Sequence, residues 1–256
     1  MYKIRFKEIT FISNRRRLSS DNIILFFYGL GCSADDLAFL FQKSKFKSQV
    51  LITELPGHNN IYYNNENLYA YARSIYLFLK RNSIKEITFF SHSIGGIIPI
   101  IMVKLFLKRK IFVKNFINYE GNLTRFDTET LTKKTSSYNF NEFVNEKFHK
   151  LVKSCCESKE KHLRSWSQSL KKTSPSAFYN LSNECVKYSE SKELLNFFRI
   201  FFKRKVYLSG EKTQTKMSKY FFGSVRLKIK NCGHFSFFEN RIEFTKIWNQ
   251  LILKKI

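Results

Sequence analysis

Short apolar runs alternate with longer amphipathic stretches through the first half of the chain. Residues 2–12 predict a strand or one arm of a hairpin, and four further runs rich in β-branched and aromatic residues predict buried strands. These four runs cover residues 22–28, 48–54, 85–91 and 111–119. Between them, apolar positions at helical spacing predict helices from near Ser33, over 66–82 and over 94–109. Strands and helices that alternate in this way are typical of an α/β fold with a mostly parallel central sheet.

The pattern changes between residues 122 and 203. This segment contains no convincing strand, no glycine and a single proline, and its successive charged amphipathic stretches predict helices. The alternating pattern then returns, with strands at 204–209 and 224–230 and a helix at 239–253. We therefore predict a core formed by residues 1–121 and 204–256, interrupted by a helical insertion at 122–203.

Glycine is scarce, with nine residues in 256, against an average usage of about 7%. Eight of the nine lie at the predicted carboxyl end of a strand or in the loop that follows it. They are Gly29, Gly31, Gly57, Gly95, Gly96, Gly121, Gly210 and Gly233. Ligands of open parallel sheets bind at this edge. The distribution of glycine therefore predicts one functional site there.

The most specific motif is Ser91-His92-Ser93-Ile94-Gly95-Gly96, between a predicted strand and a predicted helix. A nucleophilic serine at such a junction occupies a tight, strained turn, and small residues two before and two after it allow strand and helix to approach each other. Ser91 and Gly95 fill these two positions. The motif predicts that Ser93 is a nucleophile.

With this motif, the chain resembles an α/β-hydrolase over nearly its whole length. The other matching segments follow in the order of that family: Tyr28-Gly29-Leu30-Gly31, Glu54-Leu55-Pro56-Gly57-His58, and Asn231-Cys232-Gly233-His234-Phe235. The insertion after the strand that ends near Glu120 falls where this family carries a helical cap. Tyr28 departs from the pattern, because a histidine usually precedes the first glycine of this loop.

The resemblance implies the roles of four residues. Ser93 would attack a carbonyl carbon, and His234 would act as the general base. The backbone N–H groups of Leu30 and Ile94 would form the oxyanion hole. Main-chain donors carry this last function, so the tyrosine at position 28 does not weaken it.

The acid of the triad is less clear from the sequence. The usual family position, three residues beyond Gly210, is occupied by Thr213, which cannot serve. We expect Glu120 to take the role, because some branches of the family place their acid at the end of that strand. Glu211 is the alternative, and Asp127 or the absence of any acid stays open.

The formal net charge is +25, from 45 Lys and Arg against 20 Asp and Glu. The predicted insertion is not the most basic part, since residues 121–203 carry only +6 of this excess. The charge is therefore compatible with biased composition, and equally with an acidic partner. If an acidic carrier docks on the insertion, Lys147, Lys150 and Lys153, spaced three apart, are the first candidates. Without a recognisable binding module, we expect no nucleic-acid partner.

The cysteines and the apolar runs of the sequence indicate the expected cellular location and cofactors. Five cysteines without a CxxC pair favour free thiols in a reducing, cytoplasmic compartment, and they fit neither a disulfide framework nor a structural zinc site. No apolar run approaches the roughly 20 residues of a membrane span. No metal or cofactor is expected.

The predicted function is hydrolysis of a carboxylic ester by a serine enzyme. A serine at the elbow argues against the dehalogenase and epoxide-hydrolase branches, which use aspartate there. The resemblance extends to esterases that cleave the methyl ester of pimeloyl-acyl carrier protein in biotin synthesis, which makes a small acyl ester, free or carrier-bound, the expected substrate. The alternatives are a non-enzymatic binder with the same fold, and a lipase or thioesterase acting at an anionic membrane surface.

Overall fold

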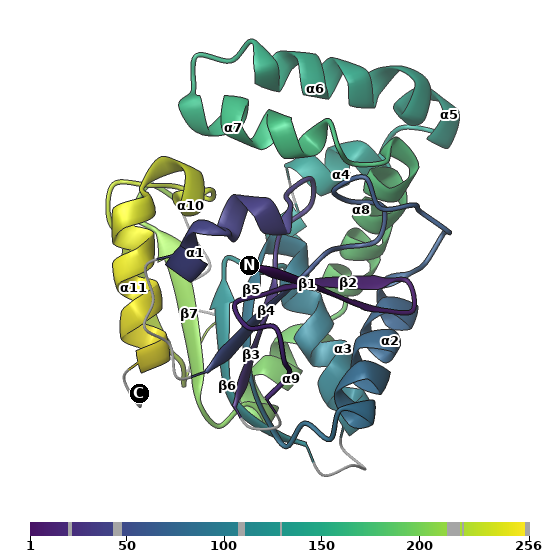
Figure 1. The fold of residues 1–256 in the computed structure, drawn as a ribbon. Coiled ribbons are helices and arrows are strands. Elements are labelled where there is room, and N and C mark those ends of the chain that lie inside the picture. Colours follow the sequence, from purple (N-terminus) through teal and green to yellow (C-terminus); the bar gives the residue numbers. More distant parts are fainter. Residues whose placement is uncertain are drawn as a thin grey trace.

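A central sheet of eight strands organises the molecule (Figure 1). The computed structural model describes residues 1–19, 22–42, 48–106, 111–128, 130–213, 221 and 223–253. The strands are β1 (Tyr2–Phe6), β2 (Ile9–Ser13), β3 (Ile23–Phe27), β4 (Gln49–Thr53), β5 (Glu86–His92), β6 (Phe112–Tyr119), β7 (Lys205–Gly210) and β8 (Val225–Ile229). Their order is β1-β2-β4-β3-β5-β6-β7-β8, and all pairs are parallel except β1–β2 and β2–β4. The predicted α/β fold with a mostly parallel sheet is confirmed.

Helices cover both faces of the sheet (Figure 1). One face carries α2 (Leu68–Arg81), α3 (Ile97–Phe106) and α9 (Glu193–Phe201), and the other carries α1 (Phe39–Gln42), α10 (Ser236–Glu239) and α11 (Arg241–Leu253). Side chains alternate along each strand, so one strand supplies both layers. Phe26 and Phe90 pack on Trp248 of α11, with ring centroids 5.6 and 4.8 Å away, while Phe116 packs on Phe198 of α9 at 5.3 Å.

The segment 122–203 is helical throughout its regular elements. A 3₁₀ turn (Arg125–Thr128) leads to α4 (Leu131–Ser136), α5 (Phe140–Glu142), a π-helical turn (Phe143–Lys147), α6 (Phe148–Cys156), α7 (Lys161–Leu170), α8 (Pro175–Glu190) and α9. Figure 1 shows α6 and α7 side by side, set apart from the sheet, whereas α9 packs on it. The division into core and cap at these boundaries stays a prediction.

Two helices differ in detail from the prediction. The helix expected over 94–109 begins with a 3₁₀ turn (Ser93–Gly96) before α3, and residues 107–110 lie outside the described residues. The helix expected over 239–253 is divided at Asn240, whose non-helical backbone ends α10. The Asn240 side chain then accepts the N–H of Glu243 at 3.2 Å and so caps the start of α11. In the described part of the chain, no helix is long and apolar enough to cross a bilayer.

Candidate active site

Ser93 occupies a strained turn between β5 and α3. Its φ is +54°, in the left-handed region that non-glycine residues rarely adopt. The neighbouring glycine is required by close packing, because a Cβ on Gly95 would lie 2.4 Å from the carbonyl oxygen of Phe27. Ser91, on the other side of the turn, is buried and donates its hydroxyl to Asn118 Oδ1 at 3.0 Å. The geometry matches the tight serine turn that the motif predicts.

Glu120 and His234 form a direct hydrogen-bonded pair. Glu120 follows β6 with a φ of +42°, and its buried carboxylate lies 2.6 Å (Oε2) from His234 Nδ1. The other carboxylate oxygen accepts the N–H of Gly210 at 2.7 Å. Because a carboxylate with these partners is an acceptor, His234 Nδ1 carries the hydrogen and Nε2 is left to accept a proton.

The loop that carries His234 is held by buried polar side chains. The Tyr119 hydroxyl donates to the carbonyl of His234 at 2.6 Å and accepts the N–H of Ser236 at 3.0 Å. The carboxylate of Glu239 accepts the N–H groups on both sides of the histidine, from Gly233 and Phe235. These bonds fix the backbone of the loop, so His234 has little freedom to turn away from Glu120.

His92, directly before Ser93, also holds the loop that carries His234 through a hydrogen bond. Its Nε2 lies 2.9 Å from the His234 carbonyl oxygen, to which it donates. Complete burial lowers the pKa of His92 well below the usual range, which keeps the ring neutral. A neutral ring with Nε2–H leaves Nδ1 unprotonated, and that buried atom has no partner among the described residues. His92 therefore positions the loop and is not a second base.

The loop after β3 presents a backbone donor to the site. The carbonyl of Gly29 accepts the N–H of Cys32 at 3.1 Å, and because a trans peptide is planar, the N–H of Leu30 points the opposite way. Leu30 lines the same pocket as Ser93. Ile94 is in the first turn of its helix, where an N–H has no intrahelical acceptor. These are the two donors expected for an oxyanion hole.

His58 holds the next peptide of this loop. Its Nε2 accepts the N–H of Gly31 at 2.9 Å, and its Nδ1–H donates to the Pro56 carbonyl at 3.0 Å. Burial lowers the pKa of His58 to about 4, so the ring is neutral and one tautomer satisfies both bonds. The role is structural, since both ring nitrogens are bonded to backbone groups and His58 is not among the residues that line the pocket of Ser93.

Tyr28, the departure from the family pattern, joins the loops after β3 and β4. Its hydroxyl donates to a carboxylate oxygen of Glu54 and accepts the N–H of Leu55 at 2.9 Å. Glu54 also accepts from the Ala34 N–H at 3.2 Å and from Asn59 at 2.8 Å. Burial raises the pKa of this carboxyl. The tyrosine therefore fixes the start of the donor loop.

Asn122 is a site residue that the sequence did not indicate. The Ser93 hydroxyl donates to Asn122 Oδ1 at 3.2 Å, and the N–H of Asn122 donates to the Ser93 carbonyl at 2.9 Å. Among the described residues, no hydrogen bond joins Ser93 Oγ to His234. Hydrogen bonds between a nucleophile and its base are often loose before substrate binds, so a reaction at Ser93 would require its Oγ to leave Asn122. An asparagine three residues after a strand carries no motif that would have singled it out.

These groups line one pocket of about 500 Å³. Its lining comprises Gly29, Leu30, His92, Ser93, Glu120, Asn122, Phe126, Asp127, Thr130, Leu131, Thr132, Trp166, Tyr207, Thr213, His234 and Phe235. Trp166 comes from α7 and donates its indole N–H to the Leu30 carbonyl at 3.2 Å, so the insertion contacts the donor loop directly. Trp166 also packs on Phe235, beside His234, with ring centroids 5.3 Å apart. One aromatic side chain thus links the insertion to the loop of Leu30 and to the loop of His234.

The alternative acids lie elsewhere or have other partners. The Glu211 carboxylate is exposed and accepts the N–H of Asn231 at 2.9 Å, so the structure does not bring it to His234. Asp127 lines the pocket, but its Oδ2 accepts the N–H groups of Leu123 and Thr124. Burial raises the pKa of Asp127 to about 6. Of these three carboxylates, Glu120 is the one within hydrogen-bond distance of His234 Nδ1.

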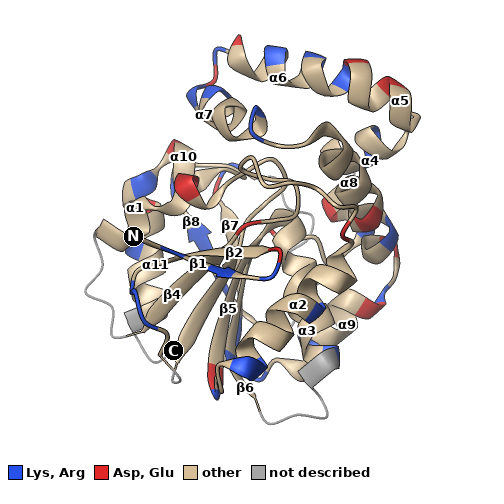
Figure 2. Ribbon diagram, turned by 45° about the vertical axis from the view of Figure 1, so that its right-hand side comes forward, with Lys and Arg blue, Asp and Glu red and all other residues tan. Residues whose placement is uncertain are grey.

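The three candidate docking lysines lie away from the pocket on the π-turn and α6. Each is close to a carboxylate of its own helical segment: Lys147 to Glu142 at 3.1 Å, Lys150 to Glu146, and Lys153 to Glu157 at 3.9 Å. Figure 2 shows basic and acidic positions along the same helix. Their positive charge is therefore partly balanced locally. Across the residues that the structure describes, no cluster of three His, Cys, Asp or Glu side chains is arranged to hold a metal.

No family model matches the chain, and no curated protein matches its sequence. Solved structures do match along almost the entire length. A carboxylesterase from the thaumarchaeon Nitrososphaera gargenis is 14% identical, with 100% of both chains covered and a TM-score of 0.73. MenH from S. aureus is 16% identical with a TM-score of 0.64, and the match covers 97% of this chain and 100% of the MenH chain.

Other similar structures carry different chemistry on the same architecture. The N-acyl homoserine lactonase AidH is 14% identical with a TM-score of 0.70, covering 98% of this chain and 95% of its own. The epoxide hydrolase CorEH is 9% identical, covers 99% of each chain and has a TM-score of 0.72. At these identities the likeness shows the fold, and the chain has the α/β-hydrolase fold.

Proposed function

We propose that the protein is a serine hydrolase that cleaves a carboxylic ester through an acyl-enzyme on Ser93. The observation that carries the proposal is the 2.6 Å bond between His234 Nδ1 and the buried Glu120 carboxylate, in the same pocket as a serine with a φ of +54°. A nucleophile on a strained turn, a base of fixed tautomer and an orienting acid are the components of acyl transfer.

Acylation begins when Ser93 Oγ attacks the ester carbonyl carbon. As the O–C bond forms, His234 Nε2 takes the hydroxyl proton, and Glu120 stabilises the resulting imidazolium. The carbonyl oxygen gains negative charge and receives the N–H groups of Leu30 and Ile94, a stabilisation of about 3–4 kcal/mol per donor. The tetrahedral intermediate collapses, the C–O bond to the alcohol breaks, and His234 returns the proton to the leaving oxygen.

Deacylation repeats these steps with water. His234 removes a proton from the water as its oxygen attacks the acyl carbon, and the same donors receive the oxyanion. Collapse breaks the bond to Ser93 Oγ, which takes the proton back from His234. The products are a carboxylic acid and an alcohol, and no redox partner is needed.

The narrower proposal concerns the substrate. A serine at the elbow supports an ester substrate, and two similar structures are by name a carboxylesterase and a lactonase, whose substrates include cyclic esters. The specific substrate that we propose is the methyl ester of a carrier-bound acyl chain, such as pimeloyl-acyl carrier protein, which the sequence resemblance suggests. Lys150 and Lys153 remain exposed for such a carrier, although each is close to a carboxylate. All five cysteines are free thiols, in keeping with a cytoplasmic location.

The direct test is labelling by a fluorophosphonate probe, followed by turnover of p-nitrophenyl acyl esters, N-hexanoyl homoserine lactone and pimeloyl-acyl carrier protein methyl ester. We expect one label per chain on Ser93, and an initial burst of p-nitrophenol that is absent in Ser93→Ala and His234→Ala. Full activity in Ser93→Ala would refute the nucleophile. No labelling of folded protein would favour a non-enzymatic binder. Turnover only on anionic vesicles would favour a lipase.

A further inference from the structure

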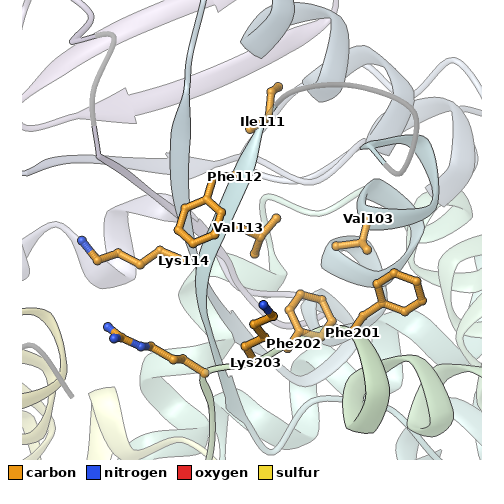
Figure 3. Close-up of a pocket in the computed structure, with 9 residues that line it drawn as sticks. Val103, Ile111, Phe112, Val113, Lys114, Phe201, Phe202 and Lys203 are labelled. Atoms are coloured by element: carbon orange, nitrogen blue, oxygen red, sulfur yellow. The ribbon is translucent and has the colours of Figure 1, made fainter.

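A second pocket, of about 490 Å³, lies at the opposite edge of the sheet from Ser93. It is formed where α3 ends, where β6 begins and where α9 leads into β7. Figure 3 shows its lining, which comprises Val103, Ile111, Phe112, Val113, Lys114, Phe201, Phe202, Lys203 and Arg204. None of these residues belongs to the catalytic pocket, and the proposed reaction does not use them.

The apolar part of this pocket has a buried floor and an exposed rim. Val103 and Phe202 are 6% and 3% exposed, whereas Phe112 is 61% and Phe201 39% exposed. Phe201 stacks on Phe197 with ring centroids 4.9 Å apart, and exposed apolar side chains grouped at a recess mark a surface on which an apolar group can bind. A recess of this size and lining fits the hydrocarbon portion of a small ligand.

The remaining lining is cationic. Lys114, Lys203 and Arg204 all border the pocket, and Figure 3 shows Lys114 on the side opposite Val103. Lys114 is paired with Glu86 at 2.9 Å. Within the described part of the chain, no carboxylate lies within 4 Å of the charged groups of Lys203 and Arg204, and both residues are exposed.

The end of α9 adds little negative potential to this side. A helix carboxyl terminus normally presents unpaired carbonyls, which repel anions. Here the Lys205 ammonium donates to the carbonyls of Arg199 and Phe202, at 2.6 and 3.0 Å. The carbonyls are thus neutralised by a residue outside the lining, and the pocket keeps a net positive rim beside an apolar floor.

We propose that this pocket binds one molecule of a single-chain anionic amphiphile, such as a medium-chain alkyl carboxylate. The chain would lie against Val103, Phe112 and Phe202, and the anionic head would reach Lys203 and Arg204. A flat bilayer could not reach the two buried floor residues, which favours a monomeric ligand over a membrane surface. The ligand would not compete for Ser93, so the proposal is independent of the catalytic one.

The test measures binding of decanoate, below its micelle concentration, by isothermal titration calorimetry, with decyltrimethylammonium as the cation of equal chain length. We expect one decanoate per chain. Lys203→Glu with Arg204→Glu should weaken binding by on the order of tenfold. Phe112→Ser with Phe201→Ser should weaken it by roughly tenfold through lost apolar contact.

Matched controls carry the same changes on other surfaces. Lys150→Glu with Lys153→Glu alters the charge equally on α6, and Ile242→Ser removes an apolar side chain that is 75% exposed on α11. Neither should change decanoate affinity. A diazirine analogue of decanoate should crosslink to peptides containing Phe112 or Phe201.

Four outcomes would overturn the proposal. These are equal affinity for the ammonium amphiphile, unchanged binding in both double variants, crosslinks confined to Trp166 and Phe235 in the catalytic pocket, and binding only to phosphatidylglycerol vesicles. The last result would assign the surface to a membrane. Because calorimetry and crosslinking need no turnover, an inactive Ser93→Ala protein serves equally well, and failure here leaves the proposed esterase untouched.

Discussion

The edge of the sheet that carries Ser93, Glu120 and His234, named the catalytic edge after the proposed function, and the α5–α7 part of the insertion are stabilised in different ways. At the catalytic edge, buried polar side chains bond to backbone groups of the loops that follow β3, β4, β6 and β8, as Tyr119 and His58 do. In α5–α7, the charged side chains pair along the surface, as Lys150 does with Glu146, while Phe143 and Phe148 form a small aromatic cluster with Phe178 of α8.

The difference shows which part of the molecule has to hold its side chains in fixed positions. A buried polar group that loses its partner costs far more than an exposed ion pair, so the bonds at the catalytic edge restrict each loop to one conformation. Exposed ion pairs contribute little to holding their helices in one position. The catalytic edge should therefore be sensitive to single conservative changes, and α5–α7 should be tolerant except at Trp166, where it contacts the donor loop.

The largest expected effect comes from the carboxylate behind His234. Glu120→Gln should lower kcat by roughly 10⁴-fold, because a neutral amide favours the wrong tautomer and no longer stabilises the imidazolium. Steady-state kinetics on a p-nitrophenyl ester would measure this. Glu211→Gln, which removes an equal charge from a carboxylate that bonds to Asn231, should leave kcat nearly unchanged. Similar small losses in both variants would remove Glu120 from the triad.

The second effect concerns the close approach at the serine turn. Gly95→Ala should lower the free energy of unfolding by about 1–3 kcal/mol, because the added Cβ meets the Phe27 carbonyl oxygen at 2.4 Å. Urea denaturation gives this value. In Gly233→Ala the nearest atom is a Glu239 carboxylate oxygen at 3.4 Å, and the loss should be clearly smaller. Equal stability of the two variants would contradict the packing described at the turn.

The free energy of unfolding should depend on pH through the buried imidazole of His58. Its folded pKa of about 4 is below the usual value of about 6.5, so the unfolded chain binds more protons between these pH values. The stability that depends on neutral His58 is complete above pH 6.5 and is lost as the pH falls to 4.

Comparison with His58→Gln isolates this contribution, because the buried carboxyls Asp36 and Asp127, with pKa values raised to about 6, give the opposite slope in both proteins. The stability gap between native protein and variant should shrink by about 3 kcal/mol from pH 7 to pH 4. Denaturation curves at both pH values measure it. A constant gap would show that His58 is not held neutral.

A smaller effect is expected where the insertion meets the catalytic edge. Trp166→Phe keeps the ring contact with Phe235 but removes the indole N–H donor to the Leu30 carbonyl, and should lower kcat/KM by roughly 3- to 10-fold. The control is Arg164→Ala on the same helix, where the guanidinium donates to the carbonyls of Ser158 and Lys159 in the α6–α7 connection. Equal losses in both would indicate a general effect of α7.

The smallest effect belongs to the ion pairs of α6. Lys150→Ala should change neither Tm nor kcat/KM measurably, because the pair with Glu146 is exposed. If the substrate is carrier-bound, the same change should raise KM for the carrier ester alone, leaving the p-nitrophenyl ester unaffected. A large loss of Tm would contradict the tolerance attributed to α5–α7.

Local sequence was sufficient for the fold class. Apolar periodicity predicted the core strands and most helices, and the scarce glycines follow the edge of the sheet where Ser93, Glu120 and His234 line one pocket. These features depend on near neighbours in the chain, through side-chain alternation, helical spacing and the steric demands of a tight turn.

Tertiary structure decided which distant groups meet. Glu120 and Glu211 both follow strands, and only the fold shows that one bonds to His234, 114 residues away, while the other bonds to Asn231. Asn122, Trp166 and the second pocket had no sequence signal, because their contacts depend on how strands, insertion and loops pack together. The sequence by itself determined most of the helices and strands and the edge of the sheet at which Ser93 lies. The packing of the fold decided which residues far apart in the sequence form hydrogen bonds, because a hydrogen bond depends on distance in space and not on separation along the chain.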